Sequence, residues 1–386
     1  MDTTDTRTKV LFIGSNDAPG GVAGYINVIV EGSASTKFEF HAVVDAIDTT
    51  VRHLSRKITL HTVDLNYHAI NFFITVFNLL NIIKRIKPDV IHLHTARAGL
   101  IGIVAARVSG TKVIYSGHSW RFEQKQGVVR KNIFLLLEKY ISKNSDFITY
   151  LTERDRNIGM RLAVATSKNS ITINTRVPTV DTRSPDERHS RPYRTVSAAP
   201  RVINVGELCE RKNPLLFLQI ATRVLETRPD VIFEWLGAGA LKSEICVMAT
   251  KMGIANSVQF PGYCPRDVID GKLDNSDIFL FTSRFEGMPL AVIEAKLHGL
   301  PVISSNYPGV EAIVRDTIDG YVFDSRSPDS AAEYLLSLLS DRELYERFSC
   351  EGYAFALAEH SDPGRMALQF MNLYERVCCD PCLSSS

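Results

Sequence analysis

The sequence predicts an α/β protein built from two doubly wound, Rossmann-like domains. Three observations support this fold class. The chain has 386 residues, more than the ~250–300 at which a single hydrophobic core stops growing. Short apolar runs alternate with segments of helical length, which is typical of parallel sheets covered by helices. The alternation occurs twice, on either side of a polar, proline-interrupted segment at 181–200.

The first alternating set predicts an N-terminal Rossmann-like domain at 1–180. Each apolar run is bounded by polar or turn-forming residues, as expected for buried parallel strands. Strands are expected at 9–15, 39–45, 58–64, 89–95, 112–119, 146–151 and 170–177, and helices at 22–31, 67–87, 99–108, 128–143 and 152–164.

The second set predicts a C-terminal Rossmann-like domain at 201–363, joined to the first by a linker at 181–200. The segment 364–386 contains a last amphipathic helix at 364–377. Strands are expected at 201–208, 231–236, 257–260, 277–281, 301–304 and 320–323, and helices at 214–227, 240–252, 289–298 and 328–340.

Composition indicates an ordinary globular protein, with 45% hydrophobic and 23% charged residues. The first residues have neither the basic start nor the apolar block of a signal peptide, and no run reaches the ~18–20 apolar residues of a membrane span. Seven Cys without regular spacing favour a reducing compartment over a disulfide framework. We therefore expect a cytoplasmic protein, and peripheral attachment to the inner face of the cell membrane stays open.

Charge is divided unevenly between the two halves. Residues 1–180 hold 23 Lys and Arg against 14 Asp and Glu, a net charge of +9, and residues 181–386 hold 21 against 29, a net charge of −8. The basic half can face phosphates, an anionic membrane surface or the acidic half. Segment 69–87 has a broad apolar face that suits a buried crossover helix or membrane contact. Nucleic acid is not favoured, because no Lys/Arg stripe is interleaved with aromatic residues.

The stretch around Glu286 and Glu294 carries the strongest functional signal. The apolar strand Ile278–Phe281 runs into a turn with Glu286 and Gly287, and Pro289 is expected as the first residue of a helix. A helix N-terminus attracts anions, and two carboxylates accept hydrogen bonds from a polyol. Together they predict a nucleotide-sugar site, although a plain strand-turn-helix with solvated Glu side chains is the alternative.

Residues 283–295, S-R-F-E-G-M-P-L-A-V-I-E-A, resemble the donor-binding motif of family 4 glycosyltransferases, which are retaining enzymes of the two-Rossmann GT-B fold. The resemblance implies that Glu286 contacts the donor sugar and that Glu294 binds the ribose. It also implies that residues 1–180 bind the acceptor, that residues 201–363 bind the nucleotide-sugar donor, and that the two domains face a cleft. The C-terminal helix and tail at 364–386 are implied to pack back on the N-terminal domain. The remaining residues expected to frame the sugar are Gly287, Met288, Pro289 and Leu290.

Two cations follow the first strand of the second domain. Arg211 and Lys212 precede Asn213 and Pro214, a helix cap and first turn, and they suit a diphosphate leaving group. The family pattern has Arg directly after the glycine and Lys five residues later. Lys212 matches, but Glu207 stands at the Arg position. Either Arg211 replaces that charge, or phosphate binding depends on Lys212 and backbone amides.

In the first domain, Gly20 and Gly21 precede a helix and can place N–H groups against a phosphate. The turn lacks the G-x-G-x-x-G spacing, which disfavours a dehydrogenase. His118 ends a predicted strand, and the resemblance implies that it contacts the donor sugar; a structural role is the alternative. His92 and His94 are expected to point toward opposite helix layers and to be partly structural, although His94 matches a family position near the cleft.

Gly237 lies in a glycine turn, Leu236–Gly239, that resembles the family turn near the nucleotide base, and 305–310 resembles a loop beside it. The whole sequence therefore predicts a retaining, hexosyltransferase-type glycosyltransferase. Its donor is a nucleoside diphosphate sugar, and its acceptor is a glycan or lipid-linked glycan in bacterial surface polysaccharide assembly (capsule, O-antigen or exopolysaccharide). No Asp-x-Asp signature predicts a metal, and no cofactor is expected. A nucleotide-sugar epimerase and a non-catalytic binding scaffold are the alternatives.

Overall fold

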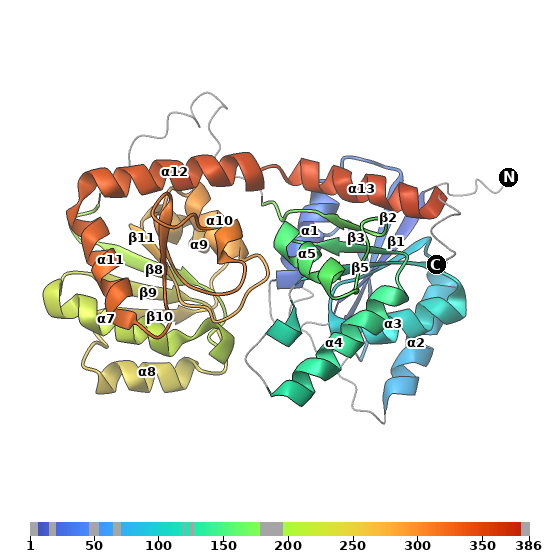
Figure 1. Ribbon diagram of the computed structural model, residues 1–386, viewed down its shortest axis with the longest axis horizontal. Helices are drawn as coiled ribbons and strands as arrows, with labels where there is room; N and C mark the ends of the chain where they lie inside the picture. Colours follow the sequence, from blue (N-terminus) through green and yellow to red (C-terminus); the bar gives the residue numbers. More distant parts are fainter. Residues whose placement is uncertain are drawn as a thin grey trace. The chain divides into compact units, whose positions relative to one another are not determined.

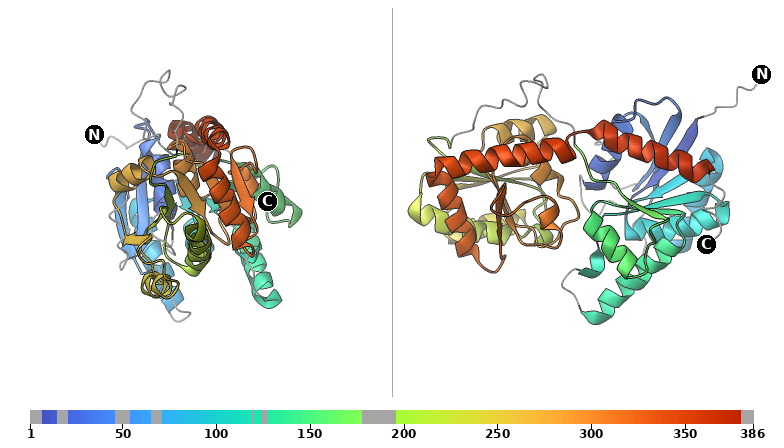
Figure 2. Two further views of the ribbon diagram at one scale, coloured as in Figure 1. Left: turned by 90° about the vertical axis from the view of Figure 1, so that its left-hand side faces the viewer. Right: turned by 45° about the horizontal axis from the view of Figure 1, so that its top comes forward.

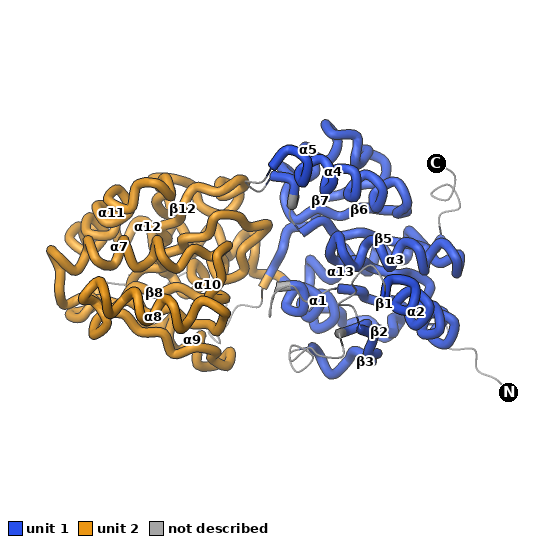
Figure 3. Tube along the Cα trace, turned by 90° about the horizontal axis from the view of Figure 1, so that it is seen from below, with its two compact units in different colours: residues 1–176, 363–386 blue, residues 177–362 orange. Residues whose placement is uncertain are grey.

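The computed structural model describes residues 7–14, 21–45, 54–64, 71–118, 120–123, 127–177 and 196–379. It contains two compact units (Figure 3). Unit 1 comprises Met1–Arg176 and Pro363–Ser386, and unit 2 comprises Val177–Asp362. Most of the predicted linker at 181–200, residues 181–195, lies outside the described residues.

Unit 1 contains a seven-stranded sheet in the order β3-β2-β1-β4-β5-β6-β7, and every neighbouring pair is parallel. Strands and helices alternate along the chain, as the sequence predicts (Figure 1). The strands are β1 (Thr8–Ile13), β2 (Phe38–Asp45), β3 (Ile58–Val63), β4 (Val90–Leu93), β5 (Lys112–Gly117), β6 (Phe147–Tyr150) and β7 (Ser170–Thr172). The α-helices are α1 (Gly21–Glu31), α2 (Phe72–Ile86), α3 (Ala96–Ser109), α4 (Val128–Lys143), α5 (Glu153–Arg161) and α13 (Pro363–Cys379).

The C-terminal helix α13 completes unit 1, which confirms the expected return of the chain to the first domain. It packs against α1 (Figures 1 and 2). Gly32 makes the contact close, because an added Cβ there would lie 2.7 Å from the Pro363 carbonyl oxygen. Tyr374 is fully buried, and its hydroxyl lies 2.8 Å from His92 Nδ1 on β4.

Unit 2 contains a six-stranded, all-parallel sheet in the order β10-β9-β8-β11-β12-β13. Apolar clusters lie on both of its faces, as expected for a sheet covered by helices. Two helices were not predicted, α9 and α12. The elements are β8 (Arg201–Val205), α7 (Pro214–Thr227), β9 (Ile232–Leu236), α8 (Lys242–Lys251), β10 (Val258–Gly262), α9 (Arg266–Asp274), β11 (Ile278–Phe281), α10 (Leu290–Leu297), β12 (Val302–Ser305), β13 (Gly320–Phe323), α11 (Pro328–Ser340) and α12 (Arg342–His360).

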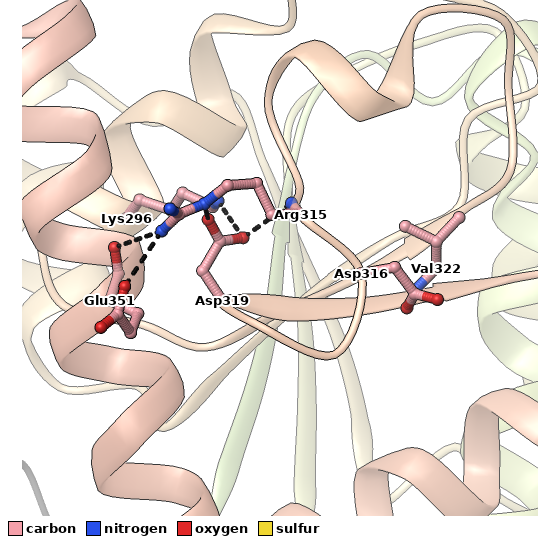
Figure 4. A network of polar contacts seen from close by, with 6 residues as sticks. All are labelled: Lys296, Arg315, Asp316, Asp319, Val322 and Glu351. Carbon is pink, nitrogen blue, oxygen red and sulfur yellow. Dashed lines mark hydrogen bonds and ion pairs between the residues drawn. The ribbon is translucent and has the colours of Figure 1, made fainter.

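A buried ion-pair network fixes helix α10 to its surroundings (Figure 4). Lys296 on α10 and Asp319 are both fully buried, and Lys296 Nζ donates to Asp319 Oδ1 at 2.6 Å. Arg315 Nε donates to the other carboxylate oxygen at 2.6 Å and reaches Glu351 on α12. The network therefore ties α10 to the connection before β13 and to α12.

Candidate active site

The site in unit 2 is built from two loops at the point where the strand order reverses direction. The chain winds outward from β8 through β9 to β10, then crosses to β11 on the other side of β8. Ligands of open α/β sheets bind outside the carboxyl ends of the strands at such a switch point. The loop 206–213 follows β8 and the loop 282–289 follows β11. Thr282 Oγ1 donates to the Lys212 carbonyl at 2.9 Å, so the two loops hold each other in place.

Glu286 is the centre of a cluster that unites three of the predicted site residues. Its Oε1 lies 2.7 Å from Arg211 Nη1 and 2.8 Å from Lys212 Nζ, and Ser283 Oγ donates to the same oxygen at 2.7 Å. The side chains of Glu286 and Lys212 are 9% and 11% exposed, and that of Arg211 is 35% exposed. Arg211 therefore offers the more accessible cation, and Lys212 the more enclosed one.

Burial and charge act in opposite directions on Glu286. Burial raises the pKa of its carboxyl, but Lys212 and Arg211 outweigh that effect and hold the pKa below the usual value. The group is therefore ionised at neutral pH. Lys212 Nζ also lies 4.8 Å from the centroid of the Phe281 ring, a cation–π contact. The Tyr307 ring packs edge-on against Phe281, and its buried hydroxyl has no hydrogen-bond partner among the described residues.

Glu294 forms a separate cluster on α10. The helix begins at Leu290, and Pro289 is its N-cap rather than its first residue, a one-residue difference from the prediction. Arg266, at the start of α9, donates to Glu294 Oε1 and pairs with Asp270 at 2.8 Å. Burial raises the pKa of Glu294, and Arg266 opposes the rise without cancelling it. The ion pair engages Oε1, and a carboxylate has a second oxygen that can accept from a ribose hydroxyl.

The glycine turn after β9 packs tightly against the loop after β8. Gly237 has φ of +143°, and an added Cβ would lie 2.0 Å from the Gly206 carbonyl oxygen. Trp235 Nε1 donates to that same carbonyl at 2.8 Å. Any side chain at Gly237 would displace the loop that carries the two cations. Gly287 and Met288 lie between Glu286 and the start of α10 and are partly exposed.

In unit 1, three histidines lie together at the carboxyl edge of the sheet. His118 follows β5 and is partly exposed, whereas His92 and His94 are fully buried. His94 Nδ1 lies 3.0 Å from His118 Nε2, and His92 Nε2 lies 2.7 Å from Ser116 Oγ. Burial lowers the pKa of all three imidazoles, that of His118 to about 4. The three rings are therefore neutral at physiological pH.

The expectation that His92 and His94 face opposite layers is wrong. Their ring centroids are 4.2 Å apart, because residues two positions apart along a strand point to the same face. His94 also contacts His118, whereas His92 bonds to Tyr374 of α13 and to Ser116. The two histidines therefore differ in role: His92 holds α13 on the sheet, and His94 holds His118.

The burial of His94 indicates which ring nitrogens of His94 and His118 carry a proton. Its Nε2 is buried and has no hydrogen-bond partner among the described residues. Burying an N–H group without an acceptor costs more free energy than burying an unprotonated ring nitrogen without a donor. His94 therefore carries its proton on Nδ1 and donates to His118 Nε2, so neutral His118 carries its own proton on Nδ1. His118 can then donate a hydrogen bond from Nδ1 to a substrate oxygen.

Most of the predicted site residues belong to unit 2. Arg211, Lys212 and Glu286 are in direct contact, and Glu294 lies on the helix that follows the same loop. His118 and Gly21, the first residue of α1, belong to unit 1. Gly20 lies outside the described residues.

Sequence reasoning missed Ser283, Arg266 and Tyr307. Ser283 stands three residues before Glu286, within the same predicted loop, and its Oγ donates to the Glu286 carboxylate. Arg266 lies 28 positions from Glu294 and has no local signal. Within the described ranges, no group of three or more His, Cys, Asp or Glu side chains could hold a metal ion. None of the helices described is long and apolar enough to cross a bilayer.

Comparison with curated proteins gives relatives that cover most of the chain. A UDP-Gal:alpha-D-GlcNAc-diphosphoundecaprenol alpha-1,3-galactosyltransferase of Escherichia coli is 27% identical over 312 residues, 78% of each chain. The putative glycosyltransferase EpsD of Bacillus subtilis is 26% identical over 293 residues, 72% of this chain and 74% of its own.

Solved structures share the fold. Sucrose-phosphate synthase from Thermosynechococcus elongatus superposes with a TM-score of 0.79 at 17% identity, over 96% of this chain and 99% of its own. Anabaena HepE in complex with UDP-glucose superposes with a TM-score of 0.76 at 14% identity, over 96% of this chain and 100% of its own. Residues 20–168 match the family described as glycosyl transferase 4-like domain, and residues 186–355 match glycosyl transferases group 1. The chain therefore belongs to the family 4 glycosyltransferases, the group 1 enzymes of the GT-B fold.

Proposed function

We propose that this glycosyltransferase transfers a hexose, with retention of anomeric configuration, from a nucleoside diphosphate sugar to a hydroxyl of a lipid-linked glycan in bacterial surface polysaccharide assembly. The observation that carries the donor assignment is the Glu286 cluster. It places one carboxylate and two cations at the switch point of unit 2, directly before the N-terminus of α10. These groups match the hydroxyls of a sugar and the charge of a diphosphate.

Each group has a part in the proposed reaction. Glu286, with Gly287, Met288, Pro289 and Leu290, holds the donor sugar, and Glu294 holds the ribose. Arg211 and Lys212 stabilise the negative charge that develops on the leaving diphosphate, so that neither a metal ion nor another cofactor is needed. The departing diphosphate then assists attack of the acceptor hydroxyl from the same face of the sugar. His118 donates from Nδ1 to an oxygen of the donor sugar, and Gly21, at the start of α1, places its N–H group near the phosphates.

The acceptor assignment is supported by the relatives. The Escherichia coli relative is named for an acceptor in which a sugar is carried on diphosphoundecaprenol. Another relative is the amylovoran biosynthesis glycosyltransferase AmsK of Erwinia amylovora, 29% identical over 147 residues, 36% of this chain. An acceptor with a polyprenyl chain stays in a bilayer, so the protein would work as a peripheral protein at the inner face of the cell membrane.

The direct test is incubation of the protein with a panel of nucleotide-sugars and lipid-linked acceptors, with release of nucleoside diphosphate as the measurement. Release that requires both donor and acceptor is expected, and the product linkage should have the anomeric configuration of the donor by NMR. Turnover should survive treatment with a chelator. Donor conversion without acceptor would instead indicate an epimerase, and donor binding without turnover would indicate a scaffold. An inverted product or a strict requirement for a divalent ion would contradict the corresponding part of the proposal.

A further inference from the structure

Exposed apolar side chains are concentrated on one group of helices in unit 1. Of the 16 large hydrophobic residues exposed in the described part of the chain, nine lie on α2, α3 and α4. α3 packs between α2 and α4, so the three helices form one continuous layer (Figure 1). Scattered exposed apolar residues are normal, but a contiguous group marks an interaction surface. The nine are Phe73, Ile74, Phe77, Val108, Val128, Val129, Ile133, Leu136 and Tyr140.

On α4 these residues form a regular stripe. Val129, Ile133, Leu136 and Tyr140 recur at helical spacing, and their exposed fractions run from 45% to 75%. Such a stripe usually faces a protein core, but on α4 it faces solvent. On α2, Phe73 is 79% exposed and Ile74 and Phe77 are about 60% exposed, all within the first two turns.

The charges on the same helices are almost all positive. α2, α3 and α4 carry eight Lys and Arg residues, seven of them exposed, and a single acid. That acid, Glu138, is buried and accepts a hydrogen bond from the Tyr115 hydroxyl. The layer therefore presents apolar side chains and cations to solvent. The eight cations are Lys84, Arg85, Arg97, Arg107, Arg130, Lys131, Lys139 and Lys143.

The position of this surface relates it to the chemistry. The sheet of unit 1 is parallel, and α2, α3 and α4 each follow a strand, so all three begin at the carboxyl edge of the sheet. The most exposed apolar residues, such as Phe73 and Val129, lie in the first turns of α2 and α4. His94 and His118 lie at that same edge, after β4 and β5.

We propose that α2, α3 and α4 form a docking face for an anionic lipid bilayer. Apolar side chains with Lys and Arg on the same helical surface suit the interface of a bilayer, where the apolar groups enter the acyl boundary and the cations meet lipid phosphates. The absence of exposed acid among the described residues of these helices gives the face the charge complementarity that such a surface requires. Docking in this orientation would hold the His118 edge of unit 1 close to a lipid-linked acceptor. Only this last statement rests on the proposed function.

Vesicle sedimentation tests the proposal without donor or acceptor. The full-length protein should partition to vesicles of phosphatidylcholine mixed with phosphatidylglycerol, and much less to phosphatidylcholine alone. Phe73→Ser with Phe77→Ser, and separately Ile133→Ser with Leu136→Ser, should each lower partitioning about tenfold or more. Arg130→Gln with Lys131→Gln should lower it by roughly fivefold per cation and weaken its salt dependence.

Matched controls come from elsewhere in the chain. Leu368 on α13 is 60% exposed, close to the 66% of Leu136, and Leu368→Ser should leave partitioning unchanged. The exposed Arg326→Gln serves the same purpose for charge. Equal losses in the control and docking-face variants, or equal partitioning to both vesicle types, would overturn the proposal. So would a change of oligomeric state in the apolar variants on size-exclusion chromatography, because the face would then bind a second copy of the chain.

Turnover separates this inference from the proposed function. The docking-face variants should lose activity with a vesicle-embedded acceptor and keep it with a water-soluble, short-chain acceptor. If wild-type protein binds anionic vesicles through this face but uses no lipid-linked acceptor, the acceptor assignment fails and the docking face stands.

Discussion

Lys212 Nζ lies 2.8 Å from Glu286 Oε1, so the most enclosed cation of the site is paired with the carboxylate assigned to the donor sugar. Arg211 contacts the same oxygen from a more exposed position. With two cations to one carboxylate, the cluster keeps an excess positive charge. That excess suits the charge of the proposed diphosphate.

Removal of either cation tests this division of labour. We expect Lys212→Ala to lower kcat/KM for the donor reaction by about 10²-fold, on the scale of a lost oxyanion-type contact. Arg211→Ala should lower kcat/KM by a smaller factor if Arg211 only supplements Lys212. It should lower kcat/KM by the same factor if Arg211 replaces the charge missing at position 207. Steady-state kinetics with a saturating acceptor measures both, with the exposed Lys251→Ala as a control. Full activity in Lys212→Ala would remove this residue from the diphosphate site.

The Arg266–Glu294 pair makes a second prediction. Glu294→Ala should weaken nucleotide binding about tenfold, because a ribose hydroxyl would lose a charge-assisted hydrogen bond of ~1.5–3 kcal/mol. Arg266→Ala removes the group that opposes the burial-driven rise in the Glu294 pKa, so the carboxyl should titrate at higher pH in that variant. Nucleotide affinity should then fall as the pH falls toward that raised pKa.

Calorimetry of nucleoside diphosphate binding across the acidic range measures both effects. A double-mutant cycle then shows whether Arg266 acts through Glu294. Additive losses would mean that the two residues contact the ligand independently, and unchanged affinity in Glu294→Ala with an intact fold would exclude the ribose assignment.

His94 and His118 give a prediction about tautomer and pH. His118 should stay neutral down to a pH near 4, whereas unfolded protein titrates near the ordinary pKa of 6.5. Because the unfolded state binds the proton first, this residue's contribution to stability is complete above 6.5 and is lost as the pH falls toward 4. NMR of ¹⁵N-labelled histidine should show His118 protonated at Nδ1, and His94→Phe should abolish that preference and lower kcat about tenfold.

The matched control is His92→Phe, which removes the bonds to Tyr374 and Ser116. It should lower the free energy of unfolding and leave the His118 tautomer unchanged. A His118 midpoint between pH 6 and 7, or the same loss of kcat at unchanged tautomer in both variants, would contradict the positioning role of His94.

The sequence predicted local features well and long-range contacts poorly. Helix α7 was predicted at its observed bounds, because Asn213 and Pro214 mark its start and its apolar face has a clear period. Helix α12 was missed because Gly352 and several charged residues interrupt its pattern. The motif around Glu286 gave the carboxylate and the loop, but the Arg266 contact depends on how α9 crosses back to the sheet.

The buried Lys296–Asp319 pair yields a prediction on stability. Burial lowers the pKa of Lys296 to about 8, against an ordinary value of 10.5. Between these values the unfolded chain holds a proton that the folded protein has released, so the Lys296 contribution to stability rises with pH across this window. Relative to Lys296→Met, the free energy of unfolding of the wild-type protein should rise by on the order of 3 kcal/mol between pH 7 and pH 10.5.

Urea denaturation of both proteins at several pH values measures this difference, and the contributions of titratable groups common to both proteins cancel. The same substitution at the exposed Lys251 should show no such trend, and a flat difference for Lys296→Met would mean that this amine stays protonated in the folded state across the whole range.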